Sequence, residues 1–247
     1  MKTFSTMLKN ECKLSLRGMD MIIFAICMPV VVMIILGIIY GNKPAFDGAS
    51  YTFLELSFGA VSSIAICAGG LMGLPLVISD YRNKKILKRY KVTPTSPALI
   101  LVVQFVIYAL YAIASLILVY VCAWALFGLQ LHGSLLGFLG AYLLVLLSMF
   151  SIGLLVGGLA PNVKTAGIAA SLLYFPMLIF SGTTLPYEAM PPALQSAADF
   201  LPMTQGIKLM KAALLNAPIE NALLPIIVMV SLAVVCIGIS IRFFKWE

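Results

Sequence analysis

Residues 21–40 read MIIFAICMPVVVMIILGIIY and contain no charged side chain. A helix of this length rises about 30 Å, which matches the hydrocarbon thickness of a bilayer. Some twenty mostly polar residues precede the stretch, and no small-residue cleavage site follows it. We therefore interpret it as a retained membrane span and not as a cleavable signal peptide.

Five further apolar stretches are long enough to be spans. They are residues 54–79, 98–127, 134–160, 165–180 and 222–243. The stretch 165–180 is short and carries Pro176, so we expect it to break or re-enter. The chain of 247 residues is 62% hydrophobic and 10% charged, with a mean hydropathy of +1.08. A soluble protein of this size has too little interior for so much apolar surface. We predict an all-α polytopic membrane protein with one six-helix domain over residues 1–247.

The distribution of Lys and Arg predicts the orientation. Thirteen of the sixteen lie in the N-terminal segment, the loops after the second and fourth spans, and the C-terminal segment, whereas only Lys43, Lys208 and Lys211 lie in the other loops. Cytoplasmic loops carry an excess of these residues. We therefore expect both termini on the cytoplasmic side of the cell (inner) membrane. This sorting also accounts for the net charge of +7 without a nucleic-acid partner.

The N-terminal segment 1–20 is amphipathic at helical spacing. One side carries Phe4, Met7, Leu8, Cys12 and Leu16, and the other carries Lys9, Lys13 and Arg17. We expect a helix that lies in the cytoplasmic interface with its cations on the lipid headgroups. A solvated helix that leads into the first span is the alternative.

The loop at residues 80–97 reads DYRNKKILKRYKVTPTSP. As a helix it places Ile86, Leu87 and Tyr90 on one face and cations on the rest, and the prolines end it before the third span. A short helix that docks a cytosolic partner fits this pattern. A basic anchor that only sets the orientation is the alternative.

The segment at residues 181–221 is too apolar for a free loop and too interrupted for one span. Prolines follow Leu185, Pro191 and Leu201. We predict a re-entrant or interfacial hairpin on the outer side, because irregular backbone at membrane depth must be covered by protein or line a cavity. A partly ordered external loop is the alternative.

The sequence offers little chemistry of its own. Glu55 is the one charged residue within a span, and it lies near the outer end of that span, whereas gradient-driven carriers usually place ionisable groups at mid-membrane. No Gly-Lys dipeptide begins a phosphate-binding loop. The five cysteines form no C-x-x-C pair, and His132 stands alone in a short loop, so neither a disulfide framework nor a metal site is indicated. Convergent groups for an intramembrane enzyme are not evident. Because mid-membrane charge and a phosphate-binding loop are both missing from the sequence, we expect any energy for transport to come from another chain.

Two motifs in this order resemble a known family. Residues 87–96, LKRYKVTPTS, are similar to a basic run that ends in Thr-Pro-x-Ser. Residues 180–202, from Phe-Ser-Gly through the three proline sites to Leu-Pro, are similar to the segment between spans five and six of the same family. The whole chain resembles the ABC-2 type permeases, the membrane subunits of one class of ABC exporters. It departs from them at Tyr81, Asn83 and Lys85, near positions where the family often has an acid and a glycine.

The resemblance implies a two-part machine. Two permease chains pair, as a homodimer or a heterodimer, and cytosolic ABC ATPase subunits bind ATP and Mg²⁺ beneath them, so this chain needs no cofactor and is not itself an enzyme. The loop helix would transmit ATPase closure to the spans. The coupling residues that we expect there are Asp80, Arg82, Ile86, Leu87, Arg89 and Tyr90.

The leading hypothesis is export of a hydrophobic or amphiphilic compound such as a drug or an antibiotic, with a role in resistance. For the substrate path we single out Glu55, Tyr174, Phe175 and Phe180, although packing or lipid contact is the ordinary role of such aromatics. The alternative is a membrane scaffold or sensor subunit without a transport path of its own.

Overall fold

The computed structural model describes residues 2–19, 21–41, 43–46, 48–87, 97–182, 187, 190–216 and 223–243. Every regular element among these residues is a helix. Six of the described helices are long and apolar enough to cross a membrane. The predicted all-α protein with six candidate spans is therefore confirmed.

The six spans follow the order of the apolar stretches. The first comprises the π-helix η1 (Ile22–Cys27) and α2 (Met28–Tyr40), and the second comprises α3 (Phe53–Cys67), the π-helix η2 (Ala68–Gly73) and α4 (Leu74–Asn83). The third to sixth are α6 (Pro97–Phe127), α7 (Leu135–Leu159), α8 (Val163–Phe180) and α11 (Leu223–Phe243). Three of the described helices are not among these candidate spans: α1 (Lys2–Gly18), α9 (Pro192–Ala198) and α10 (Pro202–Leu215).

The fifth span differs from its prediction. α8 is continuous through Pro176 and meets the length and hydropathy of a span. A proline removes one backbone hydrogen bond and bends a helix without necessarily ending it. Because the residues on both sides of Pro176 are apolar, the helix gains more from continuing than from exposing its backbone.

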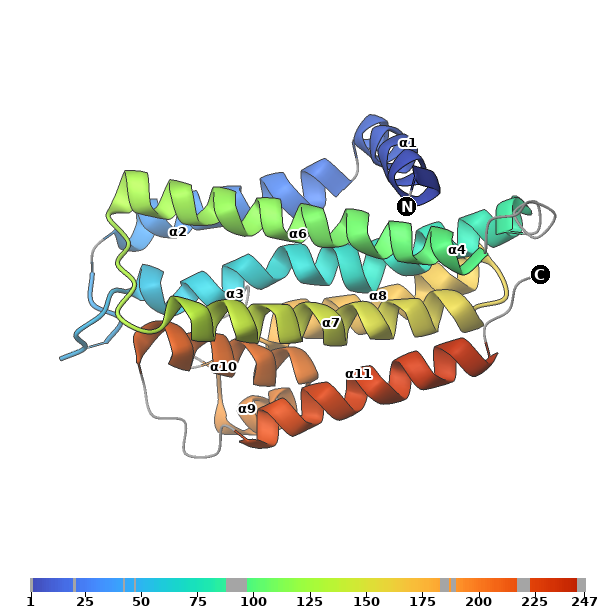
Figure 1. Cartoon of the computed structure of the whole chain (residues 1–247). Helices are drawn as coiled ribbons and strands as arrows, with labels where there is room; N and C mark the ends of the chain where they lie inside the picture. The colour runs from blue at the N-terminus through green and yellow to red at the C-terminus, as the bar shows by residue number, and fades with distance from the viewer. Residues whose placement is uncertain are drawn as a thin grey trace.

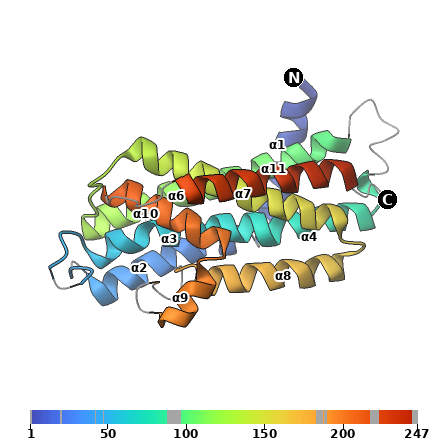
Figure 2. The same ribbon diagram turned by 90° about the horizontal axis from the view of Figure 1, so that it is seen from below.

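The second span lies at the centre of the bundle. α3 contacts α2 and α6 on one side and α10 on the other, while η2 and α4 contact α7 and α8, as Figure 1 shows. α11 packs on α7 and α10 at the far side. Seen from below, α8 runs along one edge of the bundle with α9 near its end (Figure 2). Only three residues of α8 are consequently buried, Ala166, Ala170 and Met177.

Glycines let the central span approach its neighbours closely. A Cβ at Gly153 of α7 would lie 1.9 Å from the carbonyl oxygen of Gly70 in η2, and one at Gly157 would lie 3.0 Å from Cα of Pro75. A Cβ at Gly73 would lie 2.6 Å from the ring of Tyr108 in α6. Small residues permit such contact between membrane helices, and here these glycines join spans of one chain.

The helices α9 and α10 form the described part of the segment between the fifth and sixth spans. Gly206 of α10 packs on Val145, ten residues into α7, and the carbonyl of Ala213 accepts a hydrogen bond from the backbone N–H of Ser134, just before α7 begins. At 1.5 Å per residue, α10 therefore reaches roughly 15 Å along α7. This depth suits the predicted hairpin, which stays a prediction with respect to the bilayer.

An ion pair holds α9 to α10. Nζ of Lys208 lies 2.6 Å from Oδ1 of Asp199 and 4.4 Å from the ring centre of Tyr187. The Tyr187 hydroxyl donates to the same Asp199 oxygen at 2.8 Å. Burial lowers the pKa of Lys208, but its bonds to Asp199 and Tyr187 outweigh burial and raise that pKa above its ordinary 10.5. Lys208 therefore stays protonated at neutral pH.

The described basic residues of the predicted cytoplasmic segments gather at one end of the bundle. α1, the end of α4, the turn between α7 and α8, and the end of α11 all lie toward this end (Figure 1). The opposite end holds the turns that follow α2 and α6. The arrangement suits the predicted orientation, with both termini on the cytoplasmic side, which stays a prediction.

Candidate functional site

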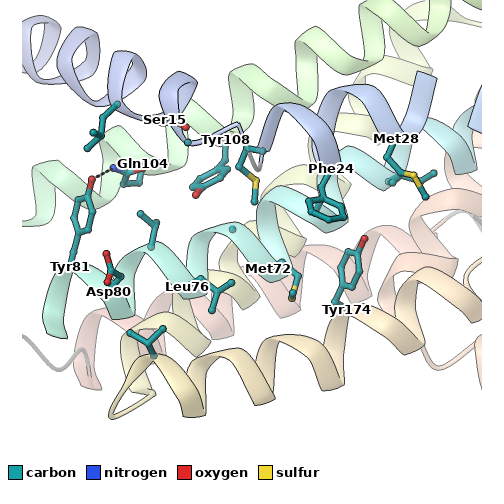
Figure 3. Close-up of a pocket in the computed structure, with 18 of the residues that line it drawn as sticks. Ser15, Phe24, Met28, Met72, Leu76, Asp80, Tyr81, Gln104, Tyr108 and Tyr174 are labelled. Carbon is teal, nitrogen blue, oxygen red and sulfur yellow. Dashed lines mark hydrogen bonds between the residues drawn. The ribbon is translucent and has the colours of Figure 1, made fainter. Parts of the chain in front are cut away.

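A cavity of about 840 Å³ opens between α1 and the first, second and fifth spans, and α6 contributes residues to its wall. Figure 3 shows that its lining is divided. Polar side chains lie at the end near α1: Ser15, Asp80, Tyr81, Gln104 and Tyr108. Aromatic and sulfur-containing side chains lie along the rest. The division makes the cavity amphiphilic along its length.

Both π-helical segments border this cavity. η1 contributes Phe24, and η2 contributes Ala68, Met72 and Gly73. The two segments also contact each other. π-Helical turns are rare, wider than α-helical turns, and frequent at functional sites. Their pairing at one cavity marks this part of the bundle as a candidate site, which periodicity in the sequence did not reveal.

Glu11 organises the polar end. Its Oε2 accepts a hydrogen bond from the Tyr81 hydroxyl at 2.5 Å and one from Nε2 of Gln104 at 2.9 Å. The same amide nitrogen donates to the Tyr81 hydroxyl at 3.2 Å. One turn along α1, Oγ of Ser15 accepts a hydrogen bond from the Tyr111 hydroxyl at 3.0 Å. Side chains from three elements thus hold α1 against the second and third spans.

The long side chains of the other end are adaptable. Phe24 and Met28 of the first span lie opposite Met72 of the second span and Tyr174 of the fifth (Figure 3). Methionine has an unbranched, polarisable side chain that adjusts to differently shaped apolar groups. The ring planes of Tyr174 and neighbouring Phe175 meet edge to face, with centres 5.3 Å apart. This end can therefore receive an apolar group of variable shape.

The four residues expected on a substrate path separate in the structure. Tyr174 and Phe175 line the cavity. Phe180, at the last position of α8, does not, and Glu55 lies far away at the start of α3. The two aromatics thus keep the proposed role with a cavity to support it.

Glu55 has a local structural task. Its Oε2 accepts from the backbone N–H of Thr52 at 2.7 Å, and the hydroxyl of Thr52 accepts from the Glu55 N–H, which is a capping box for α3. Its Oε1 accepts from the N–H of Gln130 and lies 3.3 Å from Nε2 of His132. His132 therefore has a carboxylate neighbour and does not stand alone. In the described part of the chain, no cluster of three His, Cys, Asp or Glu residues is placed to hold a metal.

The first two expected coupling residues point in different directions. Asp80 lines the cavity and forms an ion pair with Lys84, one turn on, at 2.8 Å. The guanidinium of Arg82 is buried and donates to the carbonyl oxygens of Gly157 and Ala160 at the end of α7. A cation there satisfies carbonyls that lack helical partners and complements the helix dipole. Arg82 thus ties the second span to the fourth.

The other expected coupling residues lie where α4 has ended. Lys85 adopts a left-handed conformation with φ of 58° after α4, and the chain turns. Leu87 is fully buried in this chain's own core, and Ile86 packs against that core. In this conformation Leu87 offers no surface to a partner. Arg89 and Tyr90 lie outside the described residues.

Sequence reasoning missed Glu11 and Gln104, although both carried a signal. Glu11 is the one acid in α1 and follows Met7 by four residues, which puts it on the apolar side of the helix. Gln104, Tyr108 and Tyr111 recur at helical spacing in the third span and so share one face. Polar groups on packed helix faces need hydrogen-bond partners. The polar residues of α1 and those of the third span supply such partners to each other.

The family can be read from comparison with known proteins. A family model described as ABC-2 type transporter matches residues 2–215. This chain belongs to the ABC-2 type transporter family. It is also 35% identical over 97 residues to Nodulation protein J of Rhizobium leguminosarum bv. viciae. Nodulation protein J of Neorhizobium galegae is 32% identical over 98 residues. The matched stretches cover 39% and 40% of this ABC-2 chain, and 35% of either relative.

Proposed function

We propose that this ABC-2 chain is a permease subunit of an ATP-driven exporter of hydrophobic or amphiphilic compounds such as drugs or antibiotics. It forms the transport path together with a second permease chain, identical or not. Cytosolic ABC ATPases, which bind ATP and Mg²⁺, drive it from the end where the basic residues gather.

The cavity carries this proposal. It is bordered by four spans and α1, it is polar at one end and apolar at the other, and two π-helical segments line part of it. A sizeable, mostly apolar cavity with a few convergent polar groups is the usual form of a small-molecule site. A scaffold subunit has no need of such a volume between its spans. The largely uncovered surface of α8 leaves room for the second permease chain beside the cavity.

Transport can be tested with the cavity filled. The chain is co-expressed with the ATPase that co-purifies with it. Uptake of fluorescent amphiphiles into inverted membrane vesicles, which corresponds to export from the cell, is then followed with and without ATP. Met72 and Leu76 both line the cavity one turn apart, so Met72→Trp with Leu76→Trp should abolish ATP-dependent transport. Val230 and Val234 have the same spacing on the exposed face of α11. Tryptophans at those two positions should leave transport unchanged.

Two outcomes would count against the proposal. Transport at the parental rate by the filled cavity variant would remove the cavity from the path. ATP-dependent uptake that is equal in inverted vesicles with and without this chain would favour the scaffold or sensor alternative.

A further inference from the structure

We propose that the cavity selects amphiphiles with a positively charged head, and that Glu11 is the group that receives this charge. The inference rests on the proposed function, since it names the substrate class for the same cavity. It concerns charge and orientation: the head lies at the α1 end, and the apolar tail extends along Phe24, Met72 and Tyr174.

The charge of the lining is the first observation. Glu11 and Asp80 are the carboxylates among the described lining residues, which include no Lys, Arg or His. In the chain as a whole, Lys and Arg outnumber Asp and Glu by sixteen to nine. A lining that is purely acidic in a basic chain runs against composition. An anionic head would meet the Glu11 carboxylate here with no Lys, Arg or His among the described lining residues to attract it.

The state of the two carboxylates is the second observation. Asp80 is already paired with Lys84 at 2.8 Å. Glu11 takes both of its hydrogen bonds from uncharged donors, the Tyr81 hydroxyl and the Gln104 amide, and both bonds go to Oε2. Within the described residues no ion pair neutralises Glu11. The Glu11 carboxylate is thus held in place at the cavity wall by uncharged donors, with no ion-pair partner among the described residues.

The aromatic rings are the third observation. Tyr81 and Tyr108 flank the polar end, and Phe24, Tyr174 and Phe175 line the remainder. The faces of such rings attract ammonium and similar cations, and Met72 adapts to the apolar part. Lining residues on the second span run from Ile64 to Tyr81, roughly 25 Å at the rise of a helix. A lipophilic organic cation fits both the charge and the length.

Two ions of equal size and opposite charge make the test direct. The purified chain, without ATPase, is placed in nanodiscs of phosphatidylcholine, and binding of tetraphenylphosphonium and of tetraphenylborate is measured by equilibrium dialysis against empty nanodiscs. We expect the cation to bind at least about tenfold more tightly than the anion. Glu11→Gln, whose amide oxygen can still accept from Tyr81 and Gln104, should reduce or remove this preference. Asp80→Asn should change it less, because Lys84 already offsets Asp80.

The outcomes separate this inference from the proposed function. Equal binding of the two ions by the parent protein overturns the inference whether or not the variants fold, and so does a full charge preference in a folded Glu11→Gln protein. If ATP-dependent export is found but the charge preference is absent, the exporter proposal stands and the substrate class falls. If the charge preference and its loss in Glu11→Gln are found without any export, the site stands and the exporter proposal falls.

Discussion

The contact between Gly153 and Gly70 allows a prediction with a matched control. A Cβ on Gly153 would stand 1.9 Å from the Gly70 carbonyl oxygen, whereas ordinary contact begins at 3.4 Å. Gly153→Ala must therefore move α7 and η2 apart by about 1.5 Å, and the obstacle is backbone that cannot rotate away. Overpacking typically costs about 1–3 kcal/mol, and a backbone clash belongs at the upper end. Alanine recovers up to about 1 kcal/mol through helix propensity, which leaves a net loss of about 2 kcal/mol.

Gly140 provides the control in the same helix, because a Cβ there meets nothing within 4 Å. Gly140→Ala should keep or raise stability by as much as about 1 kcal/mol. The two single-methyl variants should thus differ by roughly 3 kcal/mol, which corresponds to about 6–12 °C in the unfolding midpoint for a chain of this size. Thermal unfolding of the detergent-purified proteins, followed by size-exclusion chromatography, measures this difference. A Gly153→Ala protein as stable as Gly140→Ala would refute the close packing of α7 on η2.

Three further predictions concern single ionic groups. Arg82→Gln should lower the free energy of unfolding by about 2–4 kcal/mol, because it removes charge-assisted bonds to two buried carbonyls, with Arg82→Lys in between; thermal unfolding checks the order. Glu55→Gln should keep stability and transport, because glutamine also completes a capping box. Glu55→Ala should lower the free energy of unfolding by about 1–3 kcal/mol, because it removes the cap and the hydrogen bond from Gln130. Loss of export in the glutamine variant would restore Glu55 to the substrate path. Lys208→Met should lower the free energy of unfolding by only about 0.2–1 kcal/mol, because Lys208 and Asp199 are partly exposed. This contribution is present below the ordinary pKa of lysine and should be lost only as the pH rises through the raised pKa of Lys208. The difference in stability between parent and variant, measured by unfolding, should therefore stay constant across neutral pH.

The number and order of the spans followed from the sequence because the bilayer imposes a simple rule. Each helix must be long and apolar enough to cross the bilayer with its backbone groups hydrogen-bonded internally. Residues 21–40 predict such a helix without any tertiary information. The same rule misjudged the fifth span. Pro176 predicts a break, but α8 continues through it. The loss of one backbone hydrogen bond costs less free energy than interrupting the helix in an apolar environment.

The candidate site was only partly predictable, because it depends on which faces meet. Tyr174 and Phe175 were visible as aromatics in a span, but nothing in their spacing shows that η1 and η2 lie opposite them. Glu55 attracted attention as an acid inside an apolar stretch, and its partners at Thr52 and in the turn after α6 are set by the fold. Leu87 was placed on an exposed strip by helical periodicity, whereas α4 ends before it and the chain turns it inward.

The last turn of α4 joins the parts of the molecule that the proposals concern. Successive residues of a helix point about 100° apart, so Asp80, Tyr81 and Arg82 face three directions. Asp80 lines the cavity, Tyr81 donates to Glu11 of α1, and Arg82 donates to the end of α7. Any displacement of this turn by a partner bound to the basic segment that follows would move the wall of the cavity, the carboxylate proposed to read charge, and the fourth span together. Asp80 and Arg82 stay predicted coupling residues. We expect such coupling to act through the contacts of this turn with α1 and α7, while Leu87 packs in the core of its own chain.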